Sequence, residues 1–419
     1  MTEVALRPRP RSRRLRRVLA FVAVAGPGLI AANAGNDAGG VLTYASAGAQ
    51  FAYRTLFVMV LVTVALVVVQ EMCSRLGAYT GSGLGSLIRE QFPVRAGLGA
   101  MLLLLIANAG LTVSEFGGIG ASMELLGVSR YIAVPVALVG IWAVTVLGTY
   151  SKAERLALVL SVAFVAYPVA AIFAHPDWHL VARNLVAPHF VHSTAFLLLA
   201  VALIGTTITP YMQFYVASAV VDKHIGPESY AAERVDTVNG AIVSNIVSIF
   251  IIIATAAAIG GTGALSSARE AAAALEPVVG AAAPALFGVG LLGASLLAAM
   301  VVPLSSSYAI AESLGAERSV SDSFRRAPLF FSLFTAQLGI GAAVALLPGN
   351  LVTLVVNMQV LNGLITPVLL VFILILANRR SLLGNAANGP VFRVVATISV
   401  VAVGVLALAV VVLKALGRA

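Results

Sequence analysis

The sequence has few charged residues and almost no cysteine. Only 10% of its 419 residues are Asp, Glu, Lys or Arg, whereas 60% are hydrophobic and the mean hydropathy is +1.00. A soluble domain carries about 25% charged residues, so this chain lacks the polar surface of a cytosolic enzyme or a nucleic-acid-binding protein. The single cysteine, Cys73, excludes an intramolecular disulfide and argues against a multi-cysteine metal site. The composition indicates a polytopic membrane protein.

Long apolar runs dominate what is present. A membrane-spanning helix needs roughly 17–25 mostly apolar residues, and this rule predicts an all-α polytopic membrane protein with eleven spans. The predicted spans cover residues 19–46, 54–76, 95–126, 131–150, 154–174, 194–222, 236–260, 284–314, 327–347, 351–378 and 391–416. A tail over residues 1–18 contains seven arginines. We interpret it as a cytoplasmic anchor rather than a signal peptide, because no small-residue cleavage site precedes more hydrophilic sequence.

The basic residues are distributed unevenly along the predicted topology. With the amino terminus in the cytoplasm, 20 of the 26 Lys and Arg residues lie on the inner side. This bias is the positive-inside pattern of membrane proteins. It predicts a multi-pass protein of the plasma (inner) membrane and explains the net charge of +9 without a nucleic-acid partner. The expected partners are the lipid bilayer and a transported solute, and the pattern does not indicate an oligomeric state.

The first predicted span is interrupted in its middle. Residues 33–40 contain three glycines and two asparagines, one of which, Asn36, precedes Asp37. Each glycine weakens a helix by roughly 1 kcal/mol, and an unpaired charge at the bilayer centre costs at least ~2.5–3.5 kcal/mol. Irregular backbone occurs in membranes only where it is buried in protein or lines a watery cavity. The stretch therefore predicts a functional site at Asp37, with simple pairing between helices as the alternative.

The sixth predicted span is interrupted by Pro210. Proline has no N–H and its ring clashes with the carbonyl four residues back, so the carbonyl of Thr206 loses its helical partner. Thr207 and Thr209 place hydroxyls beside this free oxygen. A plain proline kink is the alternative interpretation.

The two interrupted spans occupy corresponding positions if spans one to five and six to ten form two repeats. Such a pair is typical of a midplane site in an inverted-repeat transporter. Because five spans is an odd number, the second repeat begins on the opposite side of the membrane. The predicted organisation is a first repeat over 19–174, an extracytoplasmic loop over 175–193, a second repeat over 194–378, and an eleventh span with the C-terminus over 379–419.

The donor atoms at the two interruptions are all oxygens. Such donors suit hard ions such as Mg²⁺, Mn²⁺ or Ca²⁺, whereas sulfur and imidazole select softer metals. Asp37 supplies one negative charge, and Mg²⁺ is usually held by one or two carboxylates with several waters retained. A roomy site with one aspartate therefore fits Mg²⁺ better than Ca²⁺. In the third span Glu115 shares a helix face with Asn108 and Thr112, and we expect it beside the ion or on its pathway.

All five histidines lie in predicted loops, so no imidazole is expected in the spans. Four of them fall in the first long outer loop or next to it: His175, His179, His189 and His192. They could collect a metal, but solvated histidines are common in such loops.

Four short motifs occur in order along the chain. They are Gly26-Pro-Gly28 followed by Asp37-Ala-Gly-Gly40, then Arg75-Leu-Gly-Ala-Tyr-Thr-Gly81, then Ser114-Glu115, then Met358-Gln359-Val360 with Asn378-Arg379-Arg380. Together they resemble the Nramp family of divalent-metal transporters. In that family GPG precedes a metal-binding DPGN motif in the first span, RLG-x-x-TG follows the second, and the third span carries Ala-Glu.

The chain departs from the family pattern at the site itself. The family's sixth span presents an alanine carbonyl and the Met of a Met-Pro-His motif to the metal, and here Thr206 and Thr209 occupy these positions. Tyr211 stands at the motif's histidine, Val216 at the family's second histidine and Gly40 at the DPGN asparagine. Loss of the thioether removes the feature that favours transition metals. The sequence thus looks like the Nramp-related magnesium transporter branch, whose site carries Mg²⁺ and also Mn²⁺ and which has lost proton coupling.

The resemblance implies a leucine-transporter-type inverted repeat of 5+5 spans, with unwound first and sixth helices and an additional eleventh span. It implies alternating access around a midplane cation that is bound by Asp37, Thr209 and the carbonyl of Thr206. Gly40 would leave room for water, and Gln359 would be a nearby polar partner. No cofactor is expected beyond the transported Mg²⁺ or Mn²⁺.

Two other transport functions remain as alternatives. A proton-coupled Mn²⁺/Fe²⁺ Nramp transporter is disfavoured by Thr209 and by the lack of histidines in the spans. An amino acid or organic solute carrier of the same fold would bind carboxylates, which Asp37 would repel. A membrane enzyme is not expected, because no span carries a histidine pair for haem, an HExxH helix or a Ser/His constellation.

Overall fold

The computed structural model describes residues 36–146, 159, 163, 166–188, 191–316 and 324–417, and every regular element in these ranges is helical. The elements are α2 Ala38–Phe51, η1 Ala52–Thr55, α3 Leu56–Thr80, α4 Leu84–Gln91, α5 Val94–Leu125, α6 Arg130–Val146, α8 Ala166–Phe173, α9 Trp178–Val186, α10 Thr194–Thr207, α11 Pro210–Asp222, α12 Tyr230–Ile259, α13 Ala268–Ala272, η3 Ala273–Leu275, α14 Glu276–Val279, η4 Gly280–Ala282, α15 Ala283–Leu314, α16 Pro328–Ala345, α17 Leu351–Asn378, α18 Arg380–Leu383, η5 Gly384–Ala386 and α19 Pro390–Ala415.

The predicted spans are largely confirmed within these ranges. Eight segments are long and apolar enough to cross a membrane, and they correspond to the second, the third and the sixth to eleventh predicted spans. The 17-residue helix α6 lies at the fourth span, and α8 covers the end of the fifth. The basic tail and residues 19–35 of the first span lie outside the described residues. The division into repeats and loops remains a prediction.

Hydropathy misplaced one boundary and missed several short helices. Helix α12 begins at Tyr230 instead of residue 236, because its first turns carry Glu233 and Arg234 and therefore fall outside an apolar window. The predicted loop 175–193 contains α9, and residues 261–283 contain four short helical segments from α13 to η4. These segments are too short or too polar for a rule based on spanning length.

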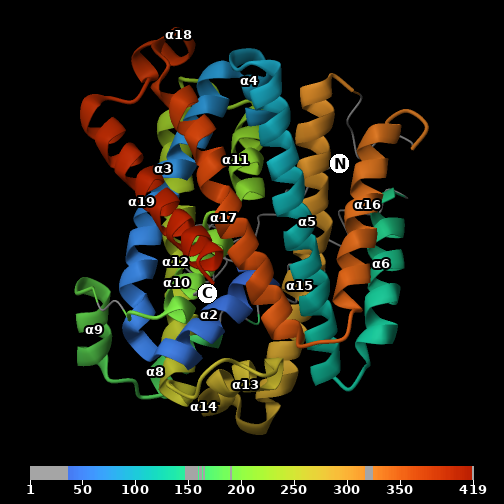
Figure 1. The fold of residues 1–419 in the computed structure, drawn as a ribbon, viewed down its shortest axis with the longest axis vertical. Coiled ribbons are helices and arrows are strands. Elements are labelled where there is room, and N and C mark those ends of the chain that lie inside the picture. The colour runs from blue at the N-terminus through green and yellow to red at the C-terminus, as the bar shows by residue number, and fades with distance from the viewer. Residues whose placement is uncertain are drawn as a thin grey trace, which may run out of the picture.

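The long helices form a bundle around two short, mostly buried helices, α2 and α10. Helix α5 packs against α15, α16 and α17, while α2 packs against α12, α10 and α17. In Figure 1, α4 and α18 mark one end of the molecule, and α9, α13 and α14 mark the other. Helix α19 crosses α17 obliquely, so that its C-terminal end lies about half-way along the length of the molecule (Figure 1). The interrupted helices therefore lie inside the bundle.

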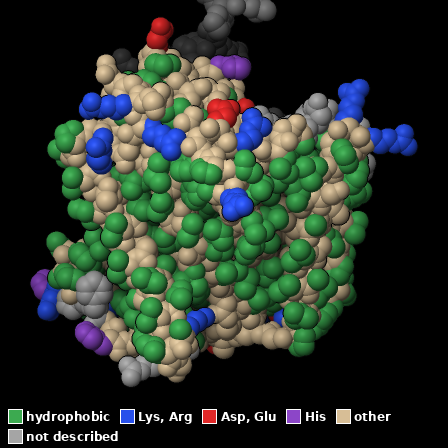
Figure 2. Space-filling model, turned by 45° about the horizontal axis from the view of Figure 1, so that its top comes forward, with side chains coloured by type: hydrophobic (Ala, Val, Ile, Leu, Met, Phe, Trp, Pro, Cys, Tyr) green, Lys and Arg blue, Asp and Glu red, His purple; other side chains and the backbone are tan. Residues whose placement is uncertain are grey.

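The outer surface is apolar around its sides. Large hydrophobic side chains are exposed along α5, α6 and α19, including Leu102, Val136, Val139, Ile398 and Leu408. Figure 2 shows hydrophobic side chains over the side of the molecule, with Lys and Arg gathered along the rim of the α4/α18 end. Such an apolar belt is unfavourable in water and suits lipid. The chain is a multi-pass integral membrane protein.

A buried ionic network lies at the α4/α18 end. The Glu71 carboxylate accepts a hydrogen bond from the Tyr230 hydroxyl at 2.9 Å, pairs with Arg75 at 3.1 Å and lies 3.4 Å from Arg234. Arg75 also donates to the side chain of Asn388, in the connection between α17 and α19. Glu71 and Arg75 are almost fully buried. The network therefore joins α3, α12 and this connection through charges that depend on one another.

Candidate metal centre

The sixth span is broken where the sequence predicted. Helix α10 ends at Thr207 and α11 begins at Pro210, and the intervening Ile208 and Thr209 have non-helical backbone angles. Since Pro210 has no N–H, the carbonyl of Thr206 cannot receive the usual helical hydrogen bond. The break thus presents backbone and hydroxyl oxygens to the interior of the bundle.

Two carboxylates meet at the amino end of α2. Asp37 is the N-cap of this helix, and its Oδ1 accepts a hydrogen bond from the N–H of Gly40 at 2.7 Å. Glu115, from the middle of α5, accepts from the N–H of Ala38 at 3.3 Å. Unpaired N–H groups and the helix dipole favour negative charge at this position. Asp37 is 4% exposed and Glu115 is fully buried, so the helix end holds both acids away from bulk water.

Gly40 lies between the first and sixth spans. A Cβ atom at this position would lie 3.3 Å from Asp37 Oδ1 and 3.3 Å from Thr206 Oγ1. These two oxygens therefore converge on the space that a side chain at residue 40 would fill. The structure brings together three of the predicted ligand positions, and glycine leaves the space between them open to an ion or its water.

Gln359 closes another side of this region. Its Nε2 donates to the Ser114 hydroxyl at 3.1 Å, and a Cβ at Gly39 would overlap the Gln359 amide. The amide therefore lies directly against the backbone of α2. Gln359 is fully buried, and α17 thus contributes to the same region as α2 and α5.

Four buried oxygens in this region have no close hydrogen-bond partner among the described residues, although two of them interact weakly with the hydroxyls of Tyr44 and Tyr211. The four oxygens are the hydroxyls of Thr206 and Thr209, Oε1 of Glu115 and Oε1 of Gln359. An unsatisfied buried polar atom costs about 1–3 kcal/mol, and native proteins contain few of them. Together with Asp37, they form a donor set that a hard cation with retained water would satisfy.

Close helix packing holds the break in place. A Cβ at Gly205 would overlap the backbone of Gln359 and Gly363, and one at Gly363 would overlap the carbonyl of Val201. Only glycine permits this approach of α10 to α17. The side-chain amide of Asn362 donates to the Gly205 carbonyl, which satisfies one backbone oxygen at the end of α10.

The other two predicted neighbours also border the region, and the Tyr211 hydroxyl interacts with the Thr209 side chain near the Asp37 and Glu115 carboxylates. Asn36 Oδ1 accepts from the Ser248 hydroxyl of α12 at 3.0 Å. The Tyr211 ring belongs to an apolar cluster with Leu111, Ala298 and Val302. Tyr211 thus packs α11 against α5 and α15, where the resembled family has a histidine.

Several contributing residues were not identified from the sequence. Ser248 binds Asn36, Tyr44 shares a hydrogen bond of 3.0 Å with Thr207, and Asn362 holds the end of α10. Thr207 was already named from the sequence beside the free carbonyl of Thr206, and Asn362 was visible as a polar residue inside an apolar span, which is a usable signal. Ser248 and Tyr44 carried no such signal, because their roles depend on which helices are neighbours.

The described part of the chain contains no group of three or more His, Cys, Asp or Glu side chains that could hold a metal. The histidines at 175, 179, 192 and 224 lie outside the spanning segments, and His189 is outside the described residues. A site built from Asp37, Glu115 and uncharged oxygens differs from a soft-metal site in its donors.

Comparisons with known proteins agree with this architecture. The divalent metal cation transporter MntH of Burkholderia ambifaria is 27% identical over 400 residues, covering 92% of this chain and 88% of that protein. The crystal structure of a mutant of the Eremococcus coleocola manganese transporter has a TM-score of 0.70 at 20% identity, covering 95% of this chain and 87% of the other. A nucleobase-cation-symport-1 family transporter has a TM-score of 0.55 at 14% identity, covering 93% of each chain.

The two structural likenesses confirm the predicted broken-helix, inverted-repeat fold class. The profile of the family described as "natural resistance-associated macrophage protein-like" matches residues 28–413, which is nearly the whole sequence. This chain belongs to the Nramp family.

Proposed function

We propose that this protein carries divalent metal cations across the membrane by alternating access, with Mg²⁺ as its main substrate and Mn²⁺ as its second, without proton coupling. The family relatives are named as divalent metal cation transporters, and the chain is accordingly a transporter rather than an enzyme. The cation is bound at the broken helices by Asp37, Thr209 and the Thr206 carbonyl, with Gly40 leaving room for water.

The observation that carries this proposal is the set of unsatisfied oxygens beside Asp37. Thr206, Thr209, Glu115 and Gln359 each bury an oxygen without a close partner among the described residues. A divalent cation supplies the positive charge that these oxygens and the Asp37 carboxylate require. An amino acid substrate would instead bring a second carboxylate next to Asp37 and Glu115, which the like charges would oppose.

The preference for Mg²⁺ follows from the chemistry of residue 209. Thr209 is buried and presents a hydroxyl where the resembled family has a methionine. A hydroxyl oxygen is a hard donor and does not favour transition metals over Mg²⁺. Mg²⁺ also keeps several waters when it binds, and the space beside Gly40 can hold such water.

The charge balance at the site is compatible with transport without protons. Asp37 and Glu115 together carry two negative charges when ionised, which equal the charge of one divalent cation. Each carboxylate accepts an N–H group at the start of α2, but burial of both away from water opposes their ionised forms, so the cation itself supplies the compensating charge. The resemblance to the magnesium branch supports transport without protons.

A proton-coupled Mn²⁺ transporter is the second candidate. The structural neighbour of TM-score 0.70 is named a manganese transporter, and Mn²⁺ also accepts oxygen ligands. A pH-sensitive dye inside proteoliposomes separates the two functions. Cation uptake without internal acidification supports the uncoupled proposal, and acidification that accompanies uptake contradicts it.

The α4/α18 end faces the cytoplasm in this proposal. The basic residues described on or beside the elements at that end include Arg75, Arg89, Arg95, Lys223, Arg234, Arg379, Arg380 and Arg393. The positive-inside rule places such a cluster in the cytoplasm, which puts the amino terminus inside as well. The plasma (inner) membrane is the proposed location.

The test is calorimetric titration with Mg²⁺, Mn²⁺ and Ca²⁺, followed by uptake into proteoliposomes. Asp37→Ala is expected to abolish Mg²⁺ binding and uptake, because it removes the carboxylate that faces Gly40. Thr209→Met is expected to shift preference toward Mn²⁺ and Cd²⁺. Thr397→Met, on the exposed face of α19, is the matched control. Normal Mg²⁺ uptake by Asp37→Ala would refute the assignment.

A further inference from the structure

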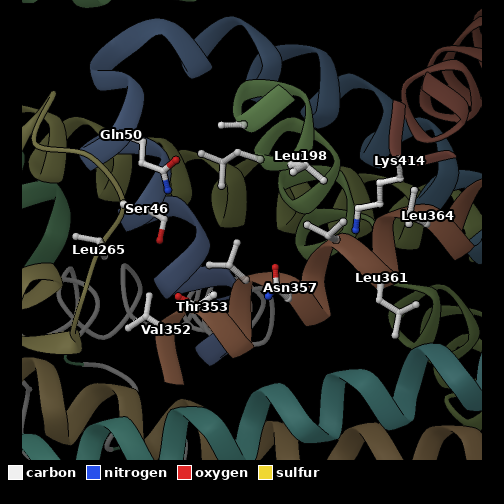
Figure 3. A pocket seen from close by; sticks show the side chains of 15 residues that line it. Ser46, Gln50, Leu198, Leu265, Val352, Thr353, Asn357, Leu361, Leu364 and Lys414 are labelled. Carbon is white, nitrogen blue, oxygen red and sulfur yellow. The ribbon is translucent and has the colours of Figure 1, made fainter. Parts of the chain in front are cut away.

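A cavity of about 530 Å³ lies beside the broken helices, toward the α13/α14 end. Its lining includes Ser46 of α2, Leu199 of α10 and Val360 of α17, and it reaches Leu265 in the segment before α13 (Figure 3). Val360 directly follows Gln359, and Ser46 lies six residues after Gly40, or about 9 Å along the helix. We call this cavity the vestibule. It lies next to the site and between the same three helices.

Lys414 is the charged residue of the vestibule lining. Its side chain extends from α19 into the space bordered by α10 and α17 (Figure 3). Leu361 and Leu364, which line the same cavity, belong to the middle of α17. Lys414 belongs to the last turn of α19 and its side chain is exposed, so it lies at the open rim of the vestibule.

Among the described residues, Lys414 has no ion-pair partner. None of the ion pairs formed among the described residues includes Lys414, and the vestibule lining contains no Asp or Glu. Lysines at the ends of spans usually extend their amino groups toward the membrane surface. Lys414 instead borders a cavity between spanning helices, where an ionisable group points to a substrate or ion pathway.

We infer that Lys414 is an electrostatic gate that slows the admission of cations to the vestibule and so limits the transport rate from the α13/α14 side. This inference rests on the proposed cation transport. The vestibule lies next to the site and the one charged residue in its described lining is positive, and we take the cavity as the route of a divalent cation from this side. The lysine therefore raises the free-energy barrier for a cation that enters or leaves through the vestibule. The free energy of the cation bound at Asp37 is left largely unchanged.

The size of the effect follows from the charges and the cavity dimensions. A sphere of about 530 Å³ is roughly 10 Å across, so roughly 8 Å is a representative distance between a cation in the cavity and the amino group. For charges of +2 and +1 at that distance in water, Coulomb repulsion with salt screening slows arrival about fourfold at 10 mM ionic strength and about twofold at 0.15 M. The dependence on salt is the signature of the mechanism.

The experiment compares Lys414→Gln, Lys414→Arg and the unchanged protein. Initial Mg²⁺ uptake is measured at cation concentrations well below KM, in proteoliposomes whose α13/α14 face is exposed to the bath. Lys414→Gln is expected to raise uptake about fourfold at 10 mM salt and about twofold at 0.15 M, and Lys414→Arg should leave it unchanged. Lys223→Gln is the matched control, because that lysine is exposed at the other end. The equilibrium Kd of Lys414→Gln from calorimetry should equal that of the unchanged protein.

Three results would overturn the inference. One is an uptake rate for Lys414→Gln that equals that of the unchanged protein at low salt. Another is an increase that does not shrink as salt is added. The third is an effect that follows the anionic lipid content of the vesicles, which would place a lipid phosphate on Lys414. Failure of the proposed function itself looks different, since the unchanged protein would then show no saturable Mg²⁺ uptake.

Discussion

Replacing Gly40 by alanine tests the location of the cation most directly. The added methyl would lie 3.3 Å from both Asp37 Oδ1 and Thr206 Oγ1 and 3.2 Å from Tyr44 Cε2. These contacts are tight but not prohibitive, so neighbouring atoms need to shift by only a few tenths of an ångström. The backbone of residue 40 is helical, where alanine is favoured over glycine by about 1 kcal/mol. The variant should therefore fold normally.

The same methyl is expected to weaken cation binding strongly. Mg²⁺–oxygen distances are about 2.0–2.1 Å, so a Mg²⁺ bound to either of these oxygens lies within about 5.4 Å of the new carbon. A water on that side of the ion is then displaced. Loss of one supporting contact at a metal site typically reduces affinity about 10- to 100-fold, which corresponds to about 1.4–2.8 kcal/mol.

The assay for Gly40→Ala is calorimetric titration with Mg²⁺, together with thermal unfolding in detergent. Gly339→Ala is the matched control, because a Cβ at this position of α16 meets no atom within 4 Å. We expect a 10- to 100-fold higher Kd for Gly40→Ala, an unchanged Kd for Gly339→Ala, and melting temperatures at or above that of the unchanged protein. A Kd for Gly40→Ala within twofold of the original would refute the reasoning, since the cation would then not lie between Asp37 and Thr206.

Two further predictions concern stability. Gly205→Ala should lower the yield and melting temperature of the folded protein, because its Cβ overlaps the α17 backbone and overpacking costs at least about 1–3 kcal/mol. Gly339→Ala is again the control. A normal melting temperature for Gly205→Ala would contradict the close approach of α10 to α17. Glu71→Ala should destabilise the folded protein by about 3–5 kcal/mol, since it leaves Arg75 buried without its ion-pair partner. Glu233→Ala removes only the longer pair with the exposed Lys223 and should change the stability by less than about 1 kcal/mol. Equal melting temperatures of the two Glu variants would show that the buried network adds nothing.

Much of the architecture could be predicted because a membrane restricts the possible structures. Helices must be long, apolar and internally hydrogen-bonded to span lipid, so hydropathy located the spans from α3 to α19 that the structure describes. The break at Thr209-Pro210 was predictable for a local reason, since proline removes a backbone hydrogen bond wherever it lies in a helix. Asp37 was identified because a charge in an apolar span is expensive.

The prediction was less complete where it depended on neighbours. Glu115 was expected beside the ion or on its pathway, but its hydrogen bond to the start of α2 depends on how α5 crosses that helix. Ser248 and Tyr44 look like ordinary helix residues until α12 and α10 are placed beside them. The role of Gly205 likewise requires the position of α17. These relations join residues that are distant in the sequence, and spacing within one helix carries no information about them.

The sequence by itself determined that this is a polytopic membrane protein, which helices are broken, and that the donors at the breaks are oxygens. These properties follow from local chemistry: apolar length, proline and glycine at set positions, and the kinds of side chain present. The tertiary structure alone decided that Asp37 and Thr206 converge on the space beside Gly40 and that α19 brings Lys414 to the vestibule. Convergence depends on crossing angles and close contacts between helices, which arise only when the helices pack together.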